Sequence, residues 1–142
     1  MEFPLDSAVI GMILVDTNVF VDVIHRDPIW LDWSLRQLSK AKTQGTVTNF
    51  VVYAELHTHD TAGPHIDAFL EKLSVQILDV SRLAAHGAAH AFRAYRQRGG
   101  SKTGVLPDFF IGAHAMADGY QLLTRDAGRY KTYFPKIKLI CP

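Results

Sequence analysis

A short, uninterrupted run of apolar residues, MILV at positions 12–15, ends directly on an aspartate, Asp16. Such a run is typical of a parallel β-strand that is covered on both faces, because no face of the strand is left for water. An ionised carboxylate is costly to desolvate, so one at the tip of a buried strand needs a hydrogen-bond donor, a positive side chain or a metal ion beside it. The run therefore predicts a covered sheet and raises the question of what accompanies Asp16.

The rest of the chain alternates between strand-like and helix-like segments. Further short strands are predicted at residues 46–50, 75–80, 120–124 and 137–141. Helices are predicted at residues 17–25, 29–45, 51–59, 65–73, 82–98 and 107–119, the last with Pro107 as its first residue. Strands that alternate with helices predict an α/β sandwich with a mainly parallel central sheet.

Composition limits the class of protein. The chain has 142 residues, a formal charge of +1 and one cysteine, Cys141. This length fits one domain, and a single cysteine excludes both an intramolecular disulfide and a cysteine-based metal cluster, so we expect a cytoplasmic protein. No apolar stretch reaches the roughly 18 residues that a membrane helix needs. Residues 1–11 resemble an appendage to a domain that spans residues 12–142, with Met12 as an alternative start.

Four acidic residues follow the predicted strands or open the predicted helices. Asp16 follows the first strand, Glu55 lies on the helix after the second, Asp108 opens the last long helix, and Asp126 follows the fourth strand. In an open parallel sheet the ligand crevice lies outside the carboxyl ends of the strands, so these positions can converge in space. Four neighbouring carboxylates repel one another, and a hard divalent cation would keep them ionised. The placement thus makes Asp16 a candidate metal ligand.

Each acid also has an ordinary structural explanation. Asp16 can cap the helix that follows it, and Asp108 can interact with the macrodipole of its own helix. Glu55 can be a solvated helix residue, and Asp126 can begin a turn or a short helix. Only their joint placement at one end of a sheet favours a functional site.

Four segments together are similar to a known family. They are MILVDTNVFVDVI (residues 12–24), TNFVVYAEL (48–56), LPDFFIGAHAMADGYQLLTRD (106–126) and IKLIC (137–141). Their order and spacing resemble the PIN-domain family and, within it, the VapC-type toxins of prokaryotic toxin–antitoxin pairs. The resemblance implies a three-layer α/β/α sandwich over residues 12–142.

The resemblance also implies an activity, a Mg²⁺- or Mn²⁺-dependent endoribonuclease that hydrolyses RNA phosphodiester bonds with a metal-activated water. Its acidic quartet is matched by Asp16, Glu55, Asp108 and Asp126. We expect Asp16 and Asp108 to be the most direct ligands, with Asn18 and Thr124 as hydrogen-bonding support. One departure is visible, because many relatives place an acid and an aromatic residue where this chain has Arg129 and Tyr130.

Basic residues cluster before and after the last long helix. The candidates for RNA binding are Arg93, Arg96, Arg98, Lys102, Arg125 and Arg129. Arginine and lysine contact phosphates, and Tyr95 among them could stack on an unpaired base. The alternative is a solvated helix face.

The histidine pairs His57/His59 and His86/His90 do not predict a zinc site, because no cysteine or third histidine completes either pair at a suitable spacing.

Two other functions remain open from the sequence. A phosphatase of the haloacid dehalogenase type also begins with an aspartate after a strand, but it needs a second acid two residues later, where this chain has Asn18. A non-catalytic PIN-like binding module is the other alternative, and four retained acids argue against it. The partners expected from the resemblance are RNA, a cognate antitoxin and a second copy of the chain in a homodimer.

Overall fold

The predicted strand at Asp16 is the centre of a parallel sheet. The computed structural model describes residues 11–59 and 63–142. Its strands are β1 (Ile13–Val15), β2 (Thr46–Asn49), β3 (Val75–Leu78), β4 (Gln121–Leu123) and β5 (Leu139–Ile140). All pairs are parallel and the spatial order is β3-β2-β1-β4-β5. The predicted α/β fold with a parallel sheet is confirmed.

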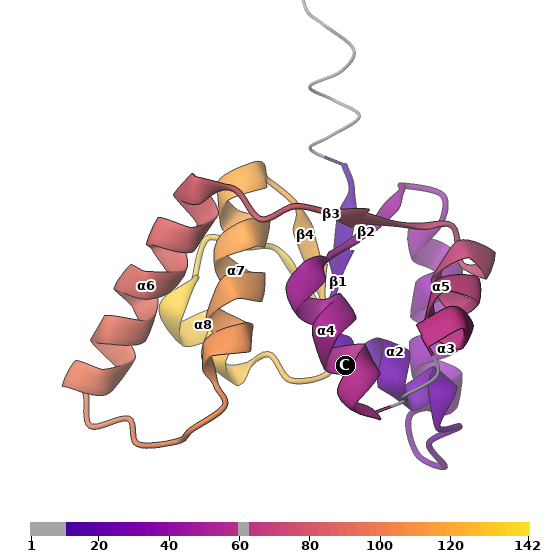
Figure 1. Cartoon of the computed structure of the whole chain (residues 1–142), viewed down its shortest axis with the longest axis horizontal. Helices are drawn as coiled ribbons and strands as arrows, with labels where there is room; N and C mark the ends of the chain where they lie inside the picture. The colour runs from indigo at the N-terminus through magenta and orange to yellow at the C-terminus, as the bar shows by residue number, and fades with distance from the viewer. Residues whose placement is uncertain (1–10, 60–62) are drawn as a thin grey trace, which may run out of the picture.

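Helices cover the sheet in two layers. They are α2 (Thr17–Ile24), α3 (Leu31–Ala41), α4 (Phe50–His59), α5 (Gly63–Lys72), α6 (Arg82–Gln97), α7 (Leu106–Asp118) and α8 (Gly128–Tyr133). Helices α6, α7 and α8 lie on one side of the sheet, and α2, α3 and α5 lie on the other (Figure 1). Helix α4 contacts both α2 and α7. None of the helices in the described ranges is long and apolar enough to span a membrane.

The structure differs from the sequence prediction in a few places. Helix α8, of six residues, follows Asp126, where the sequence suggested a turn or a short helix. Helix α7 begins at Leu106, one residue before Pro107, and the second long helix begins at Leu31 rather than at residue 29. The predicted appendage lies, except for Gly11, outside the described residues.

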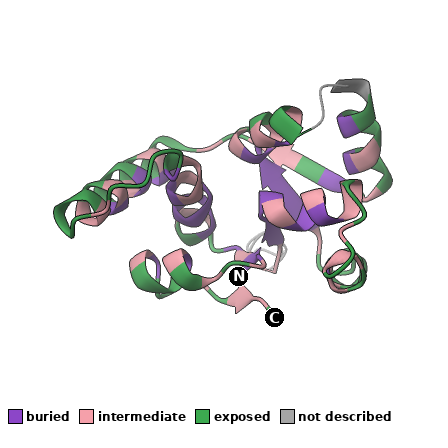
Figure 2. Ribbon diagram, turned by 90° about the horizontal axis from the view of Figure 1, so that it is seen from below, coloured by how far each residue is buried: buried purple, intermediate pink, exposed green. Residues whose placement is uncertain are grey.

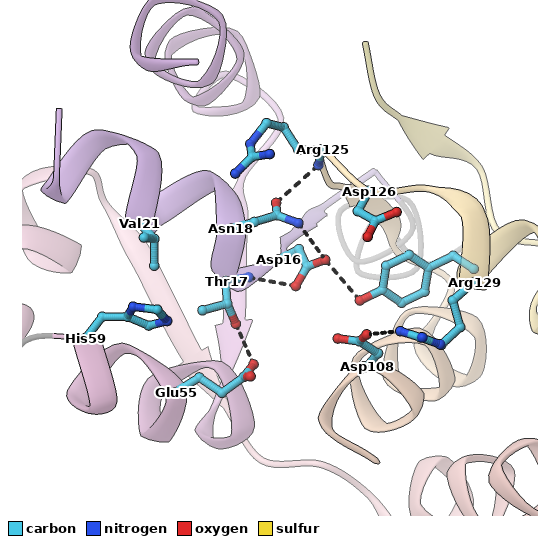
Figure 3. A pocket seen from close by; sticks show the side chains of 11 residues that line it. Asp16, Thr17, Asn18, Val21, Glu55, His59, Asp108, Arg125, Asp126 and Arg129 are labelled. Atoms are coloured by element: carbon cyan, nitrogen blue, oxygen red, sulfur yellow. Dashed lines mark hydrogen bonds and ion pairs between the residues drawn. The ribbon is translucent and has the colours of Figure 1, made fainter. Parts of the chain in front are cut away.

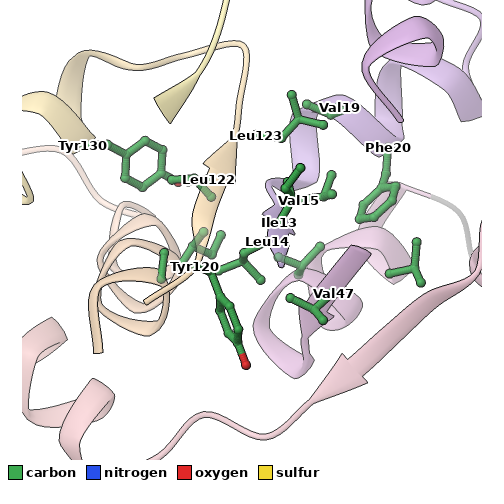
Figure 4. Close-up of a cluster of buried hydrophobic side chains, with 14 of the residues drawn as sticks. Ile13, Leu14, Val15, Val19, Phe20, Val47, Tyr120, Leu122, Leu123 and Tyr130 are labelled. Atoms are coloured by element: carbon green, nitrogen blue, oxygen red, sulfur yellow. The ribbon is translucent and has the colours of Figure 1, made fainter. Parts of the chain in front are cut away.

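Strand β1 is buried on both faces, which explains its uninterrupted apolar sequence. Ile13 is 2% exposed, and Leu14 and Val15 are fully buried. They pack with Phe20 of α2 and Val47 of β2 in the main core (Figure 4). Figure 2 shows the same distribution, with buried residues along the sheet and exposed residues on the outer helix faces. Burial of this kind stabilises a fold by roughly 25 cal/mol for each Å² of apolar surface.

Because the strands are parallel, their carboxyl ends share one edge of the sheet. The backbone N–H of Asp16 donates to the Leu123 carbonyl at 2.9 Å, and the N–H of Thr124 donates to the Ile140 carbonyl at 3.0 Å. Asp16 and Thr124 are 108 positions apart in the chain, but strand pairing places them beside each other. The edge therefore brings distant polar residues together.

Helix α8 packs against α7 at a glycine. A Cβ atom at Gly112 would lie 2.5 Å from ring atoms of Phe134 and 3.1 Å from Tyr130. Both aromatic side chains are 2% exposed, so neither can move into solvent without uncovering the core. The close approach of α7 to Tyr130 thus depends on the missing side chain at Gly112.

We expect Gly112→Ala to lower the free energy of unfolding by about 1–3 kcal/mol, because the new methyl group overpacks a buried contact. Gly87→Ala in α6 is the matched control, since its Cβ would meet only Ala113 at an ordinary 3.4 Å. That variant should be neutral or gain up to about 1 kcal/mol from helix propensity. Denaturant unfolding measures both; an unchanged midpoint for Gly112→Ala would show that α8 can shift without cost.

Candidate active site

A pocket of about 310 Å³ opens at the carboxyl edge of the sheet (Figure 3). All four acids predicted from the sequence line it: Asp16, Glu55, Asp108 and Asp126. Thr17, Asn18, Val21, His59, Arg125, Arg129 and Tyr130 complete the lining. Residues from α2, α4, α7 and the segment that follows β4 thus meet at one place.

Asp16 is the most buried of the four acids, at 5% exposure. Its Oδ1 accepts a hydrogen bond from the backbone N–H of Thr17 at 2.7 Å, so the side chain caps α2. Its Oδ2 accepts from the hydroxyls of Thr124 at 2.8 Å and Tyr130 at 3.0 Å. Burial, assisted by the charge of Asp108, raises the pKa of Asp16 to about 6 against these lowering hydrogen bonds.

Asn18 braces the same corner of the pocket. Its side-chain carbonyl accepts from the backbone N–H of Arg125 at 3.1 Å. Its amide nitrogen lies 3.4 Å from the Thr124 hydroxyl and 3.5 Å from Asp16 Oδ2. The structure thus places Asn18 and Thr124, the two residues expected to support the acids, in direct contact with Asp16.

Glu55 faces Asp16 from α4. Its carboxylate accepts a hydrogen bond from the Thr17 hydroxyl at 2.7 Å. Burial raises its pKa, the Thr17 hydrogen bond lowers it, and the charge of Asp108 raises it again. The side chain is therefore held toward the pocket by a neutral donor.

Asp108 lies in the first turn of α7 and has a cationic partner. Nη1 of Arg129 donates to Asp108 Oδ2 at 2.6 Å. Burial nevertheless raises the pKa of Asp108, opposed by the Arg129 charge and hydrogen bond and assisted by the charge of Asp126. Asp108 is electrostatically coupled to each of the other three acids, so it is the common member of the group.

Asp126 lies on the far wall of the pocket, after β4. Its backbone N–H donates to the Thr124 hydroxyl at 3.1 Å, which fixes the start of the connection to α8. Its carboxylate contributes negative charge beside Asp108.

The predicted RNA-binding residues fall into two sets. Arg125 and Arg129 line the pocket, whereas Arg93, Arg96, Arg98 and Lys102 are exposed and lie outside its lining. Two of the outer arginines lie over aromatic rings, Arg96 over Phe92 at 5.1 Å and Arg98 over Tyr133 at 5.4 Å. The outer set is therefore exposed and is not part of the acidic pocket.

The side chain of Arg125 forms an ion pair with Asp22. Its Nε and Nη2 donate to the two oxygens of Asp22 at 2.7 and 2.9 Å. Asp22 is 1% exposed and also accepts from the Ser34 hydroxyl at 2.7 Å, while Trp30 lies under the guanidinium at 5.2 Å. The pair fastens the segment after β4 to α2 and α3, so Arg125 is a bracing residue.

Sequence reasoning gave no role to Asp22 or Tyr130. Asp22 could have been noticed as the one charge within the apolar stretch VFVDVI of α2. Tyr130 was noted only as the aromatic residue after Arg129, and its contact with Asp16 depends on how α8 packs. His59, which lines the pocket one turn after Glu55, was also not assigned.

The pocket's donors suit a hard divalent cation, because Asp16, Glu55, Asp108 and Asp126 offer oxygen atoms and excess negative charge. Within residues 11–59 and 63–142, however, no three acidic, histidine or cysteine side chains are already gathered as a metal cluster. Asp108 is instead paired with Arg129, and Glu55 with Thr17. A divalent cation fits the residues present once Arg129 and Thr17 no longer bind these two carboxylates.

Comparison with known proteins identifies the family. The PIN-domain family profile matches residues 13–135. This chain belongs to the PIN-domain family. A comparison with curated proteins found no match.

The PIN domain is also similar to solved structures at low sequence identity. VapBC2 from Rickettsia felis, bound to a promoter DNA fragment, is 19% identical with a TM-score of 0.69, over 92% of this chain and 98% of that one. VapBC-1 from nontypeable Haemophilus influenzae is 15% identical with a TM-score of 0.70, over 92% and 97%. FitAcB from Neisseria gonorrhoeae is 21% identical with a TM-score of 0.66, over 91% and 96%. These likenesses support the PIN fold.

Asp16→Asn should change how the stability of the metal-free PIN domain depends on pH. The pKa of Asp16 is about 6 in the fold against an ordinary 3.8, so the folded state holds this proton more tightly than the unfolded chain. The resulting stabilisation is complete below pH 4 and is lost as the pH rises to about 6, a change on the order of 3 kcal/mol. Relative to wild type, Asp16→Asn should therefore gain stability between pH 4 and 7.

Urea unfolding in EDTA across this range measures the difference. Asp27→Asn is the control, because hydrogen bonds from the backbone N–H groups of Trp30 and Ile29 lower the pKa of Asp27 below its ordinary value. The contribution of Asp27 to stability therefore changes below pH 4, and this variant should run nearly parallel to wild type between pH 4 and 7. Parallel curves for Asp16→Asn and wild type would contradict the assignment of a buried, proton-binding Asp16.

Proposed function

We propose that this PIN domain is a Mg²⁺- or Mn²⁺-dependent endoribonuclease and the toxin of a toxin–antitoxin pair. The observation that carries the proposal is the meeting of Asp16, Glu55, Asp108 and Asp126 in one pocket at the carboxyl edge of a PIN fold. Carboxylates brought together at this density are suited to holding a hard cation.

The residues of the pocket have distinct roles in this proposal. Asp16 and Asp108 would be the direct ligands, Glu55 would hold or orient the attacking water, and Asp126 would act as an outer ligand. A bound cation would lower the pKa of that water and offset the charge of the phosphate. The Thr17 hydroxyl aims Glu55, and the hydroxyls of Thr124 and Tyr130 fix the direction of Asp16. Attack by water would leave a 5′-phosphate and a 3′-hydroxyl.

RNA would approach past the exposed basic residues at the end of α6 and in the loop that follows it. Arg93, Arg96, Arg98 and Lys102 are exposed and could contact phosphates along a single strand. Arg125 has a smaller part in this than its charge suggests, because two of its nitrogens already bind Asp22. The ring of Tyr95 packs against Phe109 and Tyr133, so its position favours support of the pocket wall over base stacking.

The toxin assignment is supported by the kind of structure this fold is similar to. Complexes named VapBC and FitAB share the fold over nearly their whole length. We therefore expect a cognate antitoxin in the cytoplasm and a homodimer. Exposed apolar side chains such as Ile29, Phe50 and Leu106 leave surface for such contacts.

Membership of the PIN family replaces the haloacid dehalogenase alternative. That class needs a second acid at the position of Asn18. Here the Asn18 side chain accepts a hydrogen bond from the Arg125 backbone N–H, which is a structural role. A non-catalytic PIN module remains the competing outcome of the experiment that follows.

Purified protein should cleave RNA only with Mg²⁺ or Mn²⁺, and Asp16→Asn or Asp108→Asn should reduce the rate by at least about 100-fold, since each removes an anionic ligand. Asp32→Asn on the exposed face of α3 is a charge-matched control and should keep full activity. Gel assays on total RNA, followed by mapping of the cleaved ends, measure this. Cleavage that survives EDTA and both substitutions would refute the metal mechanism, and no cleavage by wild type would favour a binding module.

Antitoxin release should depend on the same acids. A flexible basic segment of the partner encoded beside this chain would pair with the carboxylates, and buried pairs of this kind chiefly slow dissociation. We expect the Asp16→Asn/Asp108→Asn double variant to release the antitoxin at least about tenfold faster in metal-free buffer. Surface plasmon resonance measures the off-rate; an unchanged value would mean that the antitoxin inhibits by steric cover alone.

A further inference from the structure

One cationic side chain of the chain itself is paired with an acid inside the pocket. Arg129 lines the pocket and donates from Nη1 to Asp108 Oδ2 at 2.6 Å (Figure 3). Arg125, the other arginine in the lining, is paired outside the acidic group with Asp22. Arg129 is thus the arginine that pairs directly with one of the four acids, whereas Arg125 only lies within the range of the charge of Asp126.

The surrounding fold holds Arg129 in this place. It stands on the first turn of α8, and its guanidinium lies 5.7 Å from the centre of the Tyr95 ring. Tyr95 in turn packs against Phe109 at 5.6 Å, and its hydroxyl accepts from the backbone N–H of Lys102 at 3.0 Å. A fixed aromatic wall therefore supports the guanidinium on one side while Asp108 binds it on the other.

The partners of the acids differ in kind. Asp16 and Glu55 are held by neutral hydroxyl and amide donors, which leave their negative charge in the pocket. Asp108 is held by a full positive charge. A guanidinium and a divalent cation both bind carboxylate oxygens. Asp108 Oδ2 is already occupied by the guanidinium of Arg129.

The Arg129–Asp108 pair can also open. The side chain of Arg129 is 22% exposed and that of Asp108 is 34% exposed, so water can replace either partner. Ion pairs at this exposure contribute little to stability, because water screens the two charges. A divalent cation can therefore displace the guanidinium without unfolding the pocket.

We propose that Arg129 is a resident counter-cation that competes with the divalent ion for Asp108 and so sets the metal affinity of the pocket. This inference rests on the proposed function, since it concerns the ion of that same site. When the ion binds, Arg129 leaves Asp108 Oδ2; when the ion leaves, Arg129 returns and neutralises part of the acidic charge. The pocket is thereby kept intact in both states.

Metal binding without RNA tests the proposal. We expect Arg129→Gln to bind Mn²⁺ roughly three- to tenfold more tightly than wild type by titration calorimetry, because the competing charge is gone. Lys131→Gln is the matched control, since it removes the same charge from the exposed face of the same helix, and its affinity should stay within about twofold. Equal affinity of Arg129→Gln and wild type would overturn the inference and leave the proposed nuclease standing. Failure of all three proteins to bind Mn²⁺ would overturn both.

A second measurement uses the unaltered protein. In ¹H–¹⁵N spectra, the Nε–Hε signal of Arg129 should shift as Mg²⁺ is added and should saturate together with the backbone signal of Asp108. The corresponding signal of Arg98, which lies over Tyr133, is the internal reference and should stay in place. Saturation of Asp108 with an unmoved Arg129 would show that the pair stays closed and would overturn the inference.

Discussion

Neutral donors from separate parts of the chain converge on Asp16 at the tip of the central strand. The backbone of Thr17 comes from α2, the hydroxyl of Thr124 follows β4, and the phenol of Tyr130 comes from α8. Neutral donors orient a carboxylate without cancelling its charge, and here burial outweighs them in its effect on the pKa. The pocket therefore carries an electrostatic cost in the metal-free state, which a bound cation would relieve.

The same contacts tie the pocket to the fold. Tyr130 can reach Asp16 because Gly112 lets α8 lie close to α7. On the opposite wall, the Arg125–Asp22 pair draws the segment after β4 onto α2, where Asn18 accepts the Arg125 backbone N–H. Packing at a glycine and one partly buried ion pair thus position the two ends of the segment that carries Asp126. A change at either place would alter the pocket without touching an acid.

The sequence was sufficient for the sheet and for the candidate acids. An apolar run such as ILV needs cover on both faces, and parallel strands share one carboxyl edge, so the placement of Asp16, Glu55 and Asp108 follows from periodicity and order alone. Helix α8 has six residues and no apolar period long enough to predict its packing. Its contacts depend on tertiary packing. The partners of Arg129 and Tyr130, which lie on this helix, could therefore not be predicted from the sequence.

The contrast between neutral and charged partners extends to the antitoxin. A basic side chain from a partner and a divalent ion would both meet a pocket in which Asp108 is already engaged. If each of them displaced Arg129 from this oxygen, the two equilibria would share one step. Ligands that compete for one oxygen exclude each other there. In such a pocket the chain's own arginine would link metal binding to inhibition, because the event that frees Asp108 for the ion would also free it for the partner.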